Sequence, residues 1–512
     1  MKKNIGLYIK ILLLAWFGIF TFVNANAQSL WADELSSIGF IRTGLSLKEM
    51  FSIYLHYDTN LPLYSFILYF WYRIVPYGEQ FLLIPSILFC IGGIIFLAET
   101  AKSIKGERMH LLVVLIGCSS NAVIWQGAWE VRCYSLVFFL SAFTMWSYIR
   151  KTLNPCTKNL LIYGISVILF LWTHWFACIL LAFYGLSDLF MIIRKKSSWK
   201  VLLCYPVALL TYCPWLYVSL FTKQNLIADF WPDIPRFSNM AWTILFFLSG
   251  RRVLWYICLI TGAALCVKSV INFFKRNSQT DSALCLGCIF TLSIYWVIGI
   301  VFLYSAYINP KGSLYVERYF MVIAPHILII TAWGIDFIMN ILGKIIPDPG
   351  KHLPAVSFLP RMTQIIAVIG LCIYWVLCYK ESYSTIHKPN QEYREVSDYL
   401  IQENKLGDGR TLLAGSNKAC ILDGFIDYYF IKRDYAEPSS VIDYRDIQDR
   451  EDSRFYSNYT QYSKDDLLQY DLIYCLKIHM SYSDEFADFL NENYIPVSAD
   501  NLSGLEMWQK KE

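Results

Sequence analysis

The chain has 512 residues, of which 56% are hydrophobic and only 16% charged, with a mean hydropathy of +0.41. An ordinary soluble domain is roughly 45–50% apolar and about 25% charged, so this composition excludes a wholly soluble protein. The net charge of +4 conceals an asymmetry: residues 380–512 hold 25 acidic and 15 basic residues, and this acidic tail lacks the basic stripe of a nucleic-acid-binding protein.

Apolar runs long enough to cross a membrane, about 20 residues each, recur before residue 380 and are absent after it. The first run ends at Ala25-Asn26-Ala27, a pattern also typical of signal-peptide cleavage. We favour an uncleaved first helix, because the residues that follow it carry candidate chemistry. We predict eleven membrane helices near residues 5–24, 81–101, 109–127, 134–150, 159–173, 175–193, 200–220, 253–274, 283–304, 319–340 and 363–379.

Clusters of lysine and arginine fall at alternate helix ends. They include Lys2/Lys3, the group from Lys102 to Arg108 and the group from Arg194 to Lys200. Because short cytoplasmic loops carry an excess of basic residues, we expect a cytoplasmic N-terminus in an inner (plasma) membrane. The C-terminal part is then extracytoplasmic.

Residues 61–76 are apolar but short, and a span there would invert every later loop. We interpret them as a helix lying at the outer interface, with Tyr64 among its aromatic anchors. The first outer loop then covers residues 25–80 of a membrane domain formed by residues 1–379, and residues 221–252 and 305–318 form further outer segments.

Residues 380–512 are predicted to form a separate soluble α/β domain. Helical spacing covers 392–404 and 484–493, and strands are predicted at 410–414, 471–478 and 505–509. The charged and tyrosine-rich stretch 434–466 is expected to be a loop. With only two of the 15 cysteines after residue 380, no disulfide framework is indicated, and Cys285 and Cys288 are interpreted as packing residues.

Two adjacent carboxylates, Asp33 and Glu34, follow the first helix at the outer boundary. A partly desolvated carboxylate there could act as a general base, and the alternative is a solvated loop start. His56 and Asp58 precede the interfacial helix that carries Tyr64. They could orient a sugar or a cation, or be ordinary loop residues.

Further charged residues mark the outer ends of later helices. Glu130 and Arg132 precede the fourth span, where the alternative is a structural ion pair, and His174 separates two spans as a ligand or a packing residue. Arg318, followed by Tyr319, begins the tenth span and is a second candidate phosphate ligand or an interfacial anchor. All these candidates share one predicted depth, which indicates a cavity for an anionic lipid head group.

These segments resemble the membrane glycosyltransferases of the C-type fold, in particular the family 39-like branch related to protein O-mannosyltransferases and the lipid A aminoarabinose transferase. Trp31-Ala32-Asp33-Glu34 resembles the acidic motif after the first helix. The stretch from His56 to Tyr64 is similar to the HDxHPPLYY type, and Glu130-Val131-Arg132-Cys133-Tyr134 to E-A-R-x-Y. Thr173-His174-Trp175, Arg318-Tyr319 and two tail segments (393–396 and 470–474) also have counterparts.

The resemblance implies that Asp33 is the general base, supported by Glu34, and that Arg132 and Arg318 bind the donor phosphate. The sugar would move from a polyprenyl-phosphate donor to a glycan, lipid or protein acceptor in a single inverting displacement. Two departures affect donor binding: Asn60 and Leu61 replace a histidine and a proline of the family pattern, and Leu83 replaces an arginine.

The predicted function is therefore that of an extracytoplasmic glycosyltransferase on an eleven-helix membrane domain with an outer α/β domain. A divalent cation is possible as a cofactor, although the outer loops lack a convincing DxD motif. One rival is a transporter or flippase of lipid-linked sugars, which predicts internal repeats and mid-span charges. Another is an oligosaccharide polymerase or ligase, and a structural membrane protein is a third.

Overall fold

The computed structural model describes residues 2–57, 61–222, 232–274, 282–345, 358–388, 390–444, 464–478, 484–497 and 502–511. The chain forms two compact units. The helical unit comprises residues 1–22, 59–63 and 85–385, and the loop–tail unit comprises residues 23–58, 64–84 and 386–512. The first outer loop, which the sequence analysis grouped with the membrane helices, thus shares a unit with the C-terminal segment.

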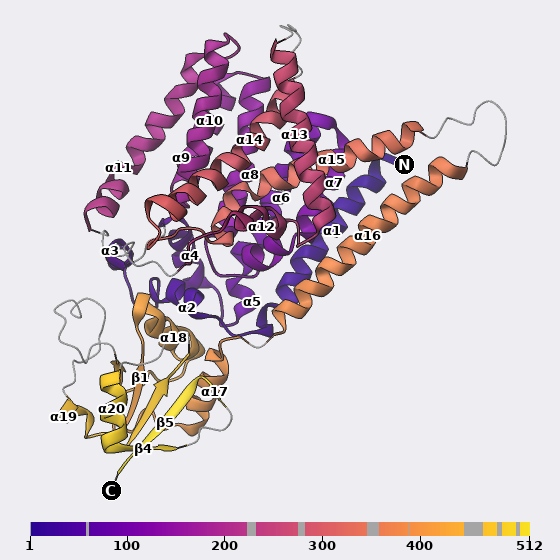
Figure 1. The fold of residues 1–512 in the computed structure, drawn as a ribbon. Coiled ribbons are helices and arrows are strands. Elements are labelled where there is room, and N and C mark those ends of the chain that lie inside the picture. Colours follow the sequence, from indigo (N-terminus) through magenta and orange to yellow (C-terminus); the bar gives the residue numbers. More distant parts are fainter. Residues whose placement is uncertain are drawn as a thin grey trace. The chain divides into compact units, whose positions relative to one another are not determined.

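The helical unit is built from long apolar helices (Figure 1). A helix is present at each of the eleven predicted positions: α1 (Lys2–Val23), α6 (Ile84–Lys105), α7 (Glu107–Ser119), α8 (Tyr134–Leu153), α9 (Thr157–Leu171), α10 (Trp175–Ile193), α11 (Cys204–Thr222), α13 (Arg252–Phe274), α14 (Ser282–Leu303), α15 (Ala324–Ile345) and α16 (Phe358–Ile386). The predicted class, a polytopic α-helical membrane protein with a C-terminal α/β domain, is confirmed.

Not every one of these helices is a complete span by itself. Among the described residues, seven are long and apolar enough to cross a membrane, or eight when α7 and the π-helix η2 (Ala122–Ala128) count as one bent span. The angle between α7 and η2 is 62°. At 15 residues, α9 is shorter than the roughly 20 residues that a bilayer requires.

Among the candidate membrane spans of the described residues, the stretch that includes α15 has the largest buried share, and α15 packs against α7, α13 and α14. Small residues allow these helices to approach closely. A Cβ atom added at Gly334 would lie 2.2 Å from Thr261 Oγ1, and one added at Gly262 would lie 2.7 Å from Thr291 Cγ2. Such glycine contacts are typical of helix pairs in membranes, where packing replaces the hydrophobic effect.

Several shorter elements lie between the long helices of this unit. They are η3 (Trp199–Leu203), α12 (Phe237–Phe247), the π-helix η5 (Tyr304–Ile308) and the 3-10 helix η6 (Glu317–Ile323). Helix α12 is apolar and lies in residues 221–252, which the sequence analysis assigned to an outer segment without predicting a helix there. Helix α16 is longer than its predicted span.

The loop–tail unit combines short helices of the first outer loop with a small α/β sheet. The outer loop supplies η1 (Ala25–Ala27), α2 (Ala32–Gly39), α3 (Leu47–Tyr57), α4 (Leu63–Ile74) and α5 (Glu79–Leu82). The tail supplies α17 (Tyr393–Glu403), η7 (Lys418–Cys420), α18 (Ile421–Tyr429), η8 (Ile431–Arg433), α19 (Lys464–Leu467) and α20 (Asp484–Asn493). Helix α4 matches the predicted apolar helix of residues 61–76.

The sheet has the strand order β2-β1-β3-β5-β4. Its strands are β1 (Thr411–Gly415), β2 (Val441–Asp443), β3 (Leu472–Leu476), β4 (Tyr494–Val497) and β5 (Leu505–Lys510). β1 is parallel to β2 and β3, and β5 is antiparallel to β3 and β4. Alternating residues such as Leu412 and Ile473 pack against Phe486 of α20 in the core.

The three strands and two helices predicted in the tail are confirmed, whereas α18, β2 and β4 were not predicted. Strand β2 lies inside the expected loop of residues 434–466, whose residues 445–463 fall outside the described part of the chain. Cys285 and Cys288 lie on α14, and Cys288 Sγ is 3.8 Å from Cys266 Sγ.

Candidate active site

Three aromatic rings from separate segments of the helical unit meet at one place. The Tyr134 and Tyr319 ring centroids are 6.2 Å apart in a stacked arrangement. The His174 ring lies 5.5 Å from Tyr319 and 6.3 Å from Tyr134. The start of α8, the junction between α9 and α10, and η6 therefore converge here.

Two arginines from different segments join these rings. The Arg318 guanidinium carbon lies 5.7 Å from the Tyr134 ring centroid and 5.9 Å from that of Tyr319. Arg132 lies close enough to interact electrostatically with both Tyr134 and His174. We call Arg132, Tyr134, His174, Arg318 and Tyr319 the arginine–aromatic cluster. It contains four of the residues predicted to bind substrate.

Hydrogen bonds to backbone carbonyls hold two of the contributing segments in place. The Ser86 hydroxyl at the start of α6 donates to the carbonyl of Glu130 over 2.9 Å. The Ser141 hydroxyl on α8 donates to the carbonyl of Val322 over 2.6 Å. Both serines are buried, so each bond pairs a buried hydroxyl with a backbone carbonyl and links two segments of the unit. The Glu130 side chain is buried beside the cluster.

His174 is the N-cap of α10. Its Nδ1 atom accepts a hydrogen bond from the backbone N–H of Phe176 over 3.2 Å. In this arrangement the neutral imidazole carries its proton on Nε2, so the opposite edge of the ring is a hydrogen-bond donor. His174 thus caps α10 through Nδ1, and its Nε2–H remains a hydrogen-bond donor within the arginine–aromatic cluster.

The Tyr134 hydroxyl is buried and finds no hydrogen-bond partner among the described residues. A buried polar group without a protein partner is costly, so this hydroxyl is suited to donate a hydrogen bond to a bound ligand. The adjacent arginines make an anionic oxygen the best match. Planar guanidinium groups and a phenol donor together suit a phosphate.

Asp33 and Glu34 lie in the first turn of α2, in the loop–tail unit, but their environments differ. Glu34 is buried, and its Oε2 accepts a hydrogen bond from the backbone N–H of Trp31 over 3.1 Å. This is the helix-capping contact of a carboxylate at position N3. Asp33 is partly exposed, and its carbonyl accepts from the Ser37 hydroxyl within the helix.

Helix α2 crosses α18 at glycine contacts. A Cβ atom added at Gly424 would lie 1.9 Å from the carbonyl oxygen of Leu35, and one at Gly39 would lie 2.1 Å from that of Cys420. The two backbones therefore touch directly, which is possible only because both positions lack a side chain. The register of the helix that carries Asp33 is determined by this contact with the C-terminal segment.

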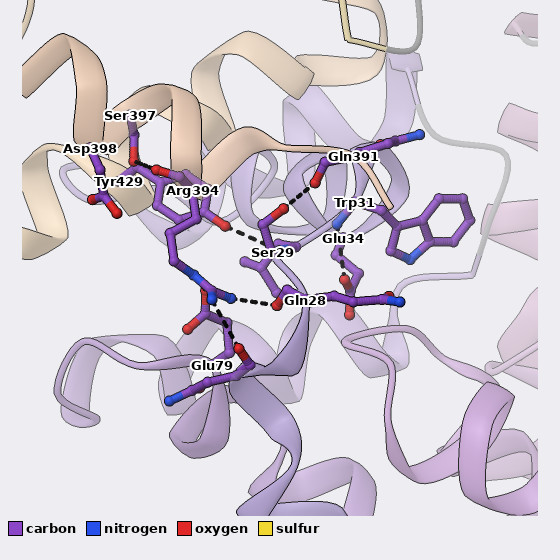
Figure 2. Close-up of polar contacts among 12 residues, drawn as sticks. Gln28, Ser29, Trp31, Glu34, Glu79, Gln391, Arg394, Ser397, Asp398 and Tyr429 are labelled. Carbon is purple, nitrogen blue, oxygen red and sulfur yellow. Dashed lines mark hydrogen bonds and ion pairs between the residues drawn. The ribbon is translucent and has the colours of Figure 1, made fainter. Parts of the chain in front are cut away.

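A second set of bonds holds the extended segment before α2 (Figure 2). The Ser29 hydroxyl donates to the carbonyl of Gln391, and the Gln391 side-chain oxygen accepts from the backbone N–H of Ala32 over 2.7 Å. The Tyr429 hydroxyl accepts from the backbone N–H of Leu30 over 3.1 Å. The C-terminal segment thus supplies hydrogen-bond partners for Ser29, Leu30 and Ala32.

Arg394 on α17 adds charged contacts to the hydrogen bonds that hold the segment before α2 (Figure 2). It pairs with Glu79 at 2.8 Å and donates to the carbonyls of Asn26 and Gln28. Burial raises the pKa of the Glu79 carboxyl, and the nearby Arg394 only partly offsets this effect. Desolvation of Glu79 therefore outweighs its attraction to the arginine.

Three other predicted site residues lie in or beside the first outer loop. Tyr64 is buried on the first turn of α4. His56 lies on the last turn of α3, but its side chain, like the whole of Asp58, falls outside the described residues. Among the described residues, no group of three or more His, Cys, Asp or Glu side chains could hold a metal ion.

Sequence reasoning did not assign roles to Tyr134, Ser86, Gly39, Gly424 or Arg394. Tyr134 was visible as the last residue of the quoted Glu130–Tyr134 stretch, and Ser86 lies three residues after Leu83, one of the noted departures from the family pattern. The glycine crossing and the Glu79–Arg394 pair join residues more than 300 positions apart, and no local pattern reports such contacts.

No protein-family model and no curated protein matches this chain. The fold is that of solved C-type membrane glycosyltransferases. The structure of ArnT from Cupriavidus metallidurans in the apo state matches with a TM-score of 0.62, 11% identity and 97% of each chain covered. The same protein bound to undecaprenyl phosphate matches with a TM-score of 0.58 and 12% identity over the same coverage.

The archaeal oligosaccharyltransferase AglB from Archaeoglobus fulgidus, in complex with an inhibitory peptide and a dolichol-phosphate, has a TM-score of 0.52 and 10% identity. That match covers 100% of this chain and 75% of AglB. At such low identities these similarities establish the fold.

Proposed function

We propose that this protein is a membrane glycosyltransferase that moves one sugar from a polyprenyl-phosphate donor to an acceptor outside the cytoplasm. The observation that carries the proposal is the arginine–aromatic cluster. Arg132 and Arg318 approach the same buried Tyr134 from two different segments, beside the donor edge of His174. The fold shared with a transferase structure bound to undecaprenyl phosphate supports the same substrate class.

The reaction is a single displacement with inversion at the anomeric carbon. The acceptor hydroxyl loses its proton to the Asp33 carboxylate as its oxygen forms a bond to that carbon. The bond from the anomeric carbon to the phosphate oxygen breaks, and its electron pair leaves with polyprenyl phosphate. Positive charge from Arg132 and Arg318 stabilises this leaving group. The fixed orientation of donor and acceptor in the site lowers the remaining activation barrier.

Glu34 has a structural role in this mechanism, because its carboxylate caps the helix that presents Asp33. Glu130, Tyr64, His56 and Asp58 are proposed to shape the binding sites for the sugar and the acceptor. We further propose an inner-membrane location with the N-terminus in the cytoplasm and the C-terminal segment outside, from the basic loops alone.

The decisive experiment measures transfer from a panel of radiolabelled polyprenyl-phosphate sugars in membranes that carry equal amounts of each protein. Asp33→Asn should abolish transfer, while Asp488→Asn on the exposed face of α20 is the matched control and should retain it. Transfer that survives Asp33→Asn would remove Asp33 from the mechanism.

If the wild-type protein transfers no sugar from any donor, the enzyme proposal fails. A flipping assay with the same lipids would then test the transporter interpretation. Transfer of a whole glycan chain in preference to a single sugar would favour a polymerase or ligase.

A further inference from the structure

A groove of about 770 Å³ lies on the side of the helical unit formed by α10, α13 and α14, away from the arginine–aromatic cluster. Its walls are apolar side chains of all three helices, among them Leu186, Phe190, Val270, Phe273 and Leu292. Ligand pockets in proteins are roughly 300–1,000 Å³, so the groove is large enough for a lipid chain.

The side chains that line the groove are exposed on the surface of the protein, and no other part of the described chain covers them. Phe190 is 49% exposed, Val270 is 52% exposed and Leu186 is 51% exposed. These residues belong to helices that meet the length and hydropathy of membrane spans. In a bilayer the groove would therefore open to the hydrocarbon region.

Two basic residues also line this groove. Arg194 and Lys196 directly follow α10. The Arg194 guanidinium lies 4.5 Å from the Phe273 ring centroid, a cation–π contact that holds it against the wall contributed by α13. The Lys196 backbone N–H donates to the carbonyl of Met191 over 2.9 Å, which fixes the turn that carries both residues.

We infer that this groove binds an anionic phospholipid, with one acyl chain along the apolar walls and the phosphate at Arg194 and Lys196. The combination of an apolar trough and basic residues at one end matches the two parts of such a lipid and does not match a soluble metabolite. Basic pockets between membrane helices on the cytoplasmic side bind anionic head groups in this way. The inference does not depend on the proposed transfer reaction.

The test counts lipids that remain bound to the detergent-purified protein by native mass spectrometry during titration with phosphatidylglycerol or phosphatidylcholine. The double variant Arg194→Gln/Lys196→Gln should bind phosphatidylglycerol about 30-fold more weakly, at about 1 kcal/mol per basic residue. The matched control Arg150→Gln/Lys158→Gln removes two exposed basic residues at the α8–α9 junction and should bind like the wild type.

A second pair of variants tests the acyl-chain part of the site without changing charge. Val270→Trp fills the groove and should also displace phosphatidylglycerol, whereas Val267→Trp, at an equally exposed position of α13 outside the groove, should not. Equal affinity for the two lipids would overturn the inference. So would phosphatidylglycerol binding that is unchanged by both the double variant and Val270→Trp.

Discussion

The arginine–aromatic cluster and helix α2 carry the two halves of the proposed chemistry, but they are stabilised in different ways. The cluster lies inside the helical unit, and serine hydroxyls on neighbouring helices fix its backbone. Helix α2 has eight residues and is held by α18 and by Gln391, which follow it by more than 350 positions in the chain.

This difference predicts how substitutions in the two regions affect the protein. Substitutions in the cluster should alter donor binding and catalysis while the helices stay assembled, because each residue contributes a contact to a rigid bundle. Substitutions at the α2–α18 contact should act through the position of Asp33. The C-terminal segment thus holds the helix that carries Asp33, the proposed base, and five experiments can test that distinction.

The largest effect is expected in the cluster. Arg318→Ala should lower the turnover number for transfer about 100-fold or more, since removing one preorganised group that stabilises developing charge costs about 10²–10³ in rate. Arg318→Lys should recover part of this loss, because it keeps the charge but not the planar donors. Steady-state kinetics with a purified lipid-linked donor measures both.

Arg150→Ala, at an exposed site on the last turn of α8, is the control for Arg318→Ala and should keep wild-type turnover. If Arg318→Ala raises only the donor KM and leaves turnover intact, the arginine binds the ground state without stabilising the leaving phosphate.

The next effect tests the glycine crossing. Gly424→Leu places a side chain where a Cβ atom would lie 1.9 Å from the Leu35 carbonyl oxygen, so α2 must shift. Overpacking of this kind costs about 1–3 kcal/mol. Hydrogen exchange should accelerate in residues 30–40, and transfer should fall together with it.

Gly407→Leu is the matched control for Gly424→Leu, because a Cβ atom at Gly407 meets nothing within 4 Å. Normal transfer in Gly424→Leu together with faster exchange in α2 would show that the position of this helix does not limit the reaction. That outcome would also count against Asp33, the residue that this helix carries, as the general base.

The Glu79–Arg394 pair is expected to show a smaller and asymmetric effect. Arg394→Gln leaves the buried Glu79 carboxylate without its cation and removes the bonds to Asn26 and Gln28, which should cost about 2 kcal/mol. Glu79→Gln should cost less, because burial already raises the pKa of Glu79 and favours its neutral form. Thermal unfolding of the two purified variants measures the difference.

The pH dependence of stability follows from the same pKa direction. A carboxyl whose folded pKa lies above its unfolded value binds its proton more tightly when folded, so lowering the pH through that raised pKa adds stability. In Glu79→Gln this gain should be absent. A gain of equal size in both proteins would assign it to another group.

The smallest effect separates the two adjacent carboxylates. Glu34→Gln should change transfer less than twofold, since a glutamine at position N3 also accepts the hydrogen bond from the Trp31 backbone N–H. Asp33→Asn, in contrast, should abolish transfer. Equal losses in the two variants would show that Glu34 also takes part in the chemistry.

Much of the fold could be predicted from the sequence. Long apolar runs give the membrane helices because only helices satisfy their own backbone groups in lipid. Short apolar runs bounded by polar turns gave β1 and β3, and a short run after the last helix gave β5. Helix α18 was missed because it is short and its buried face pairs with α2, a contact that sequence periodicity does not report. Strand β2 was missed because its three residues sit in a charged stretch.

For the site, the sequence by itself determined which charged and polar residues lie near the ends of the membrane helices. The apolar runs show where each helix ends, and the residues next to those ends can then be read directly. Arg132, His174 and Arg318 were found in that way. Only the tertiary structure decided that they share the ring of Tyr134, and that Glu34 caps a helix while Asp33 does not. Only the tertiary structure decided that Gly424 and Arg394 hold the segment that carries Asp33. Those facts depend on backbone approach and burial between distant parts of the chain, which are properties of packing and not of local sequence.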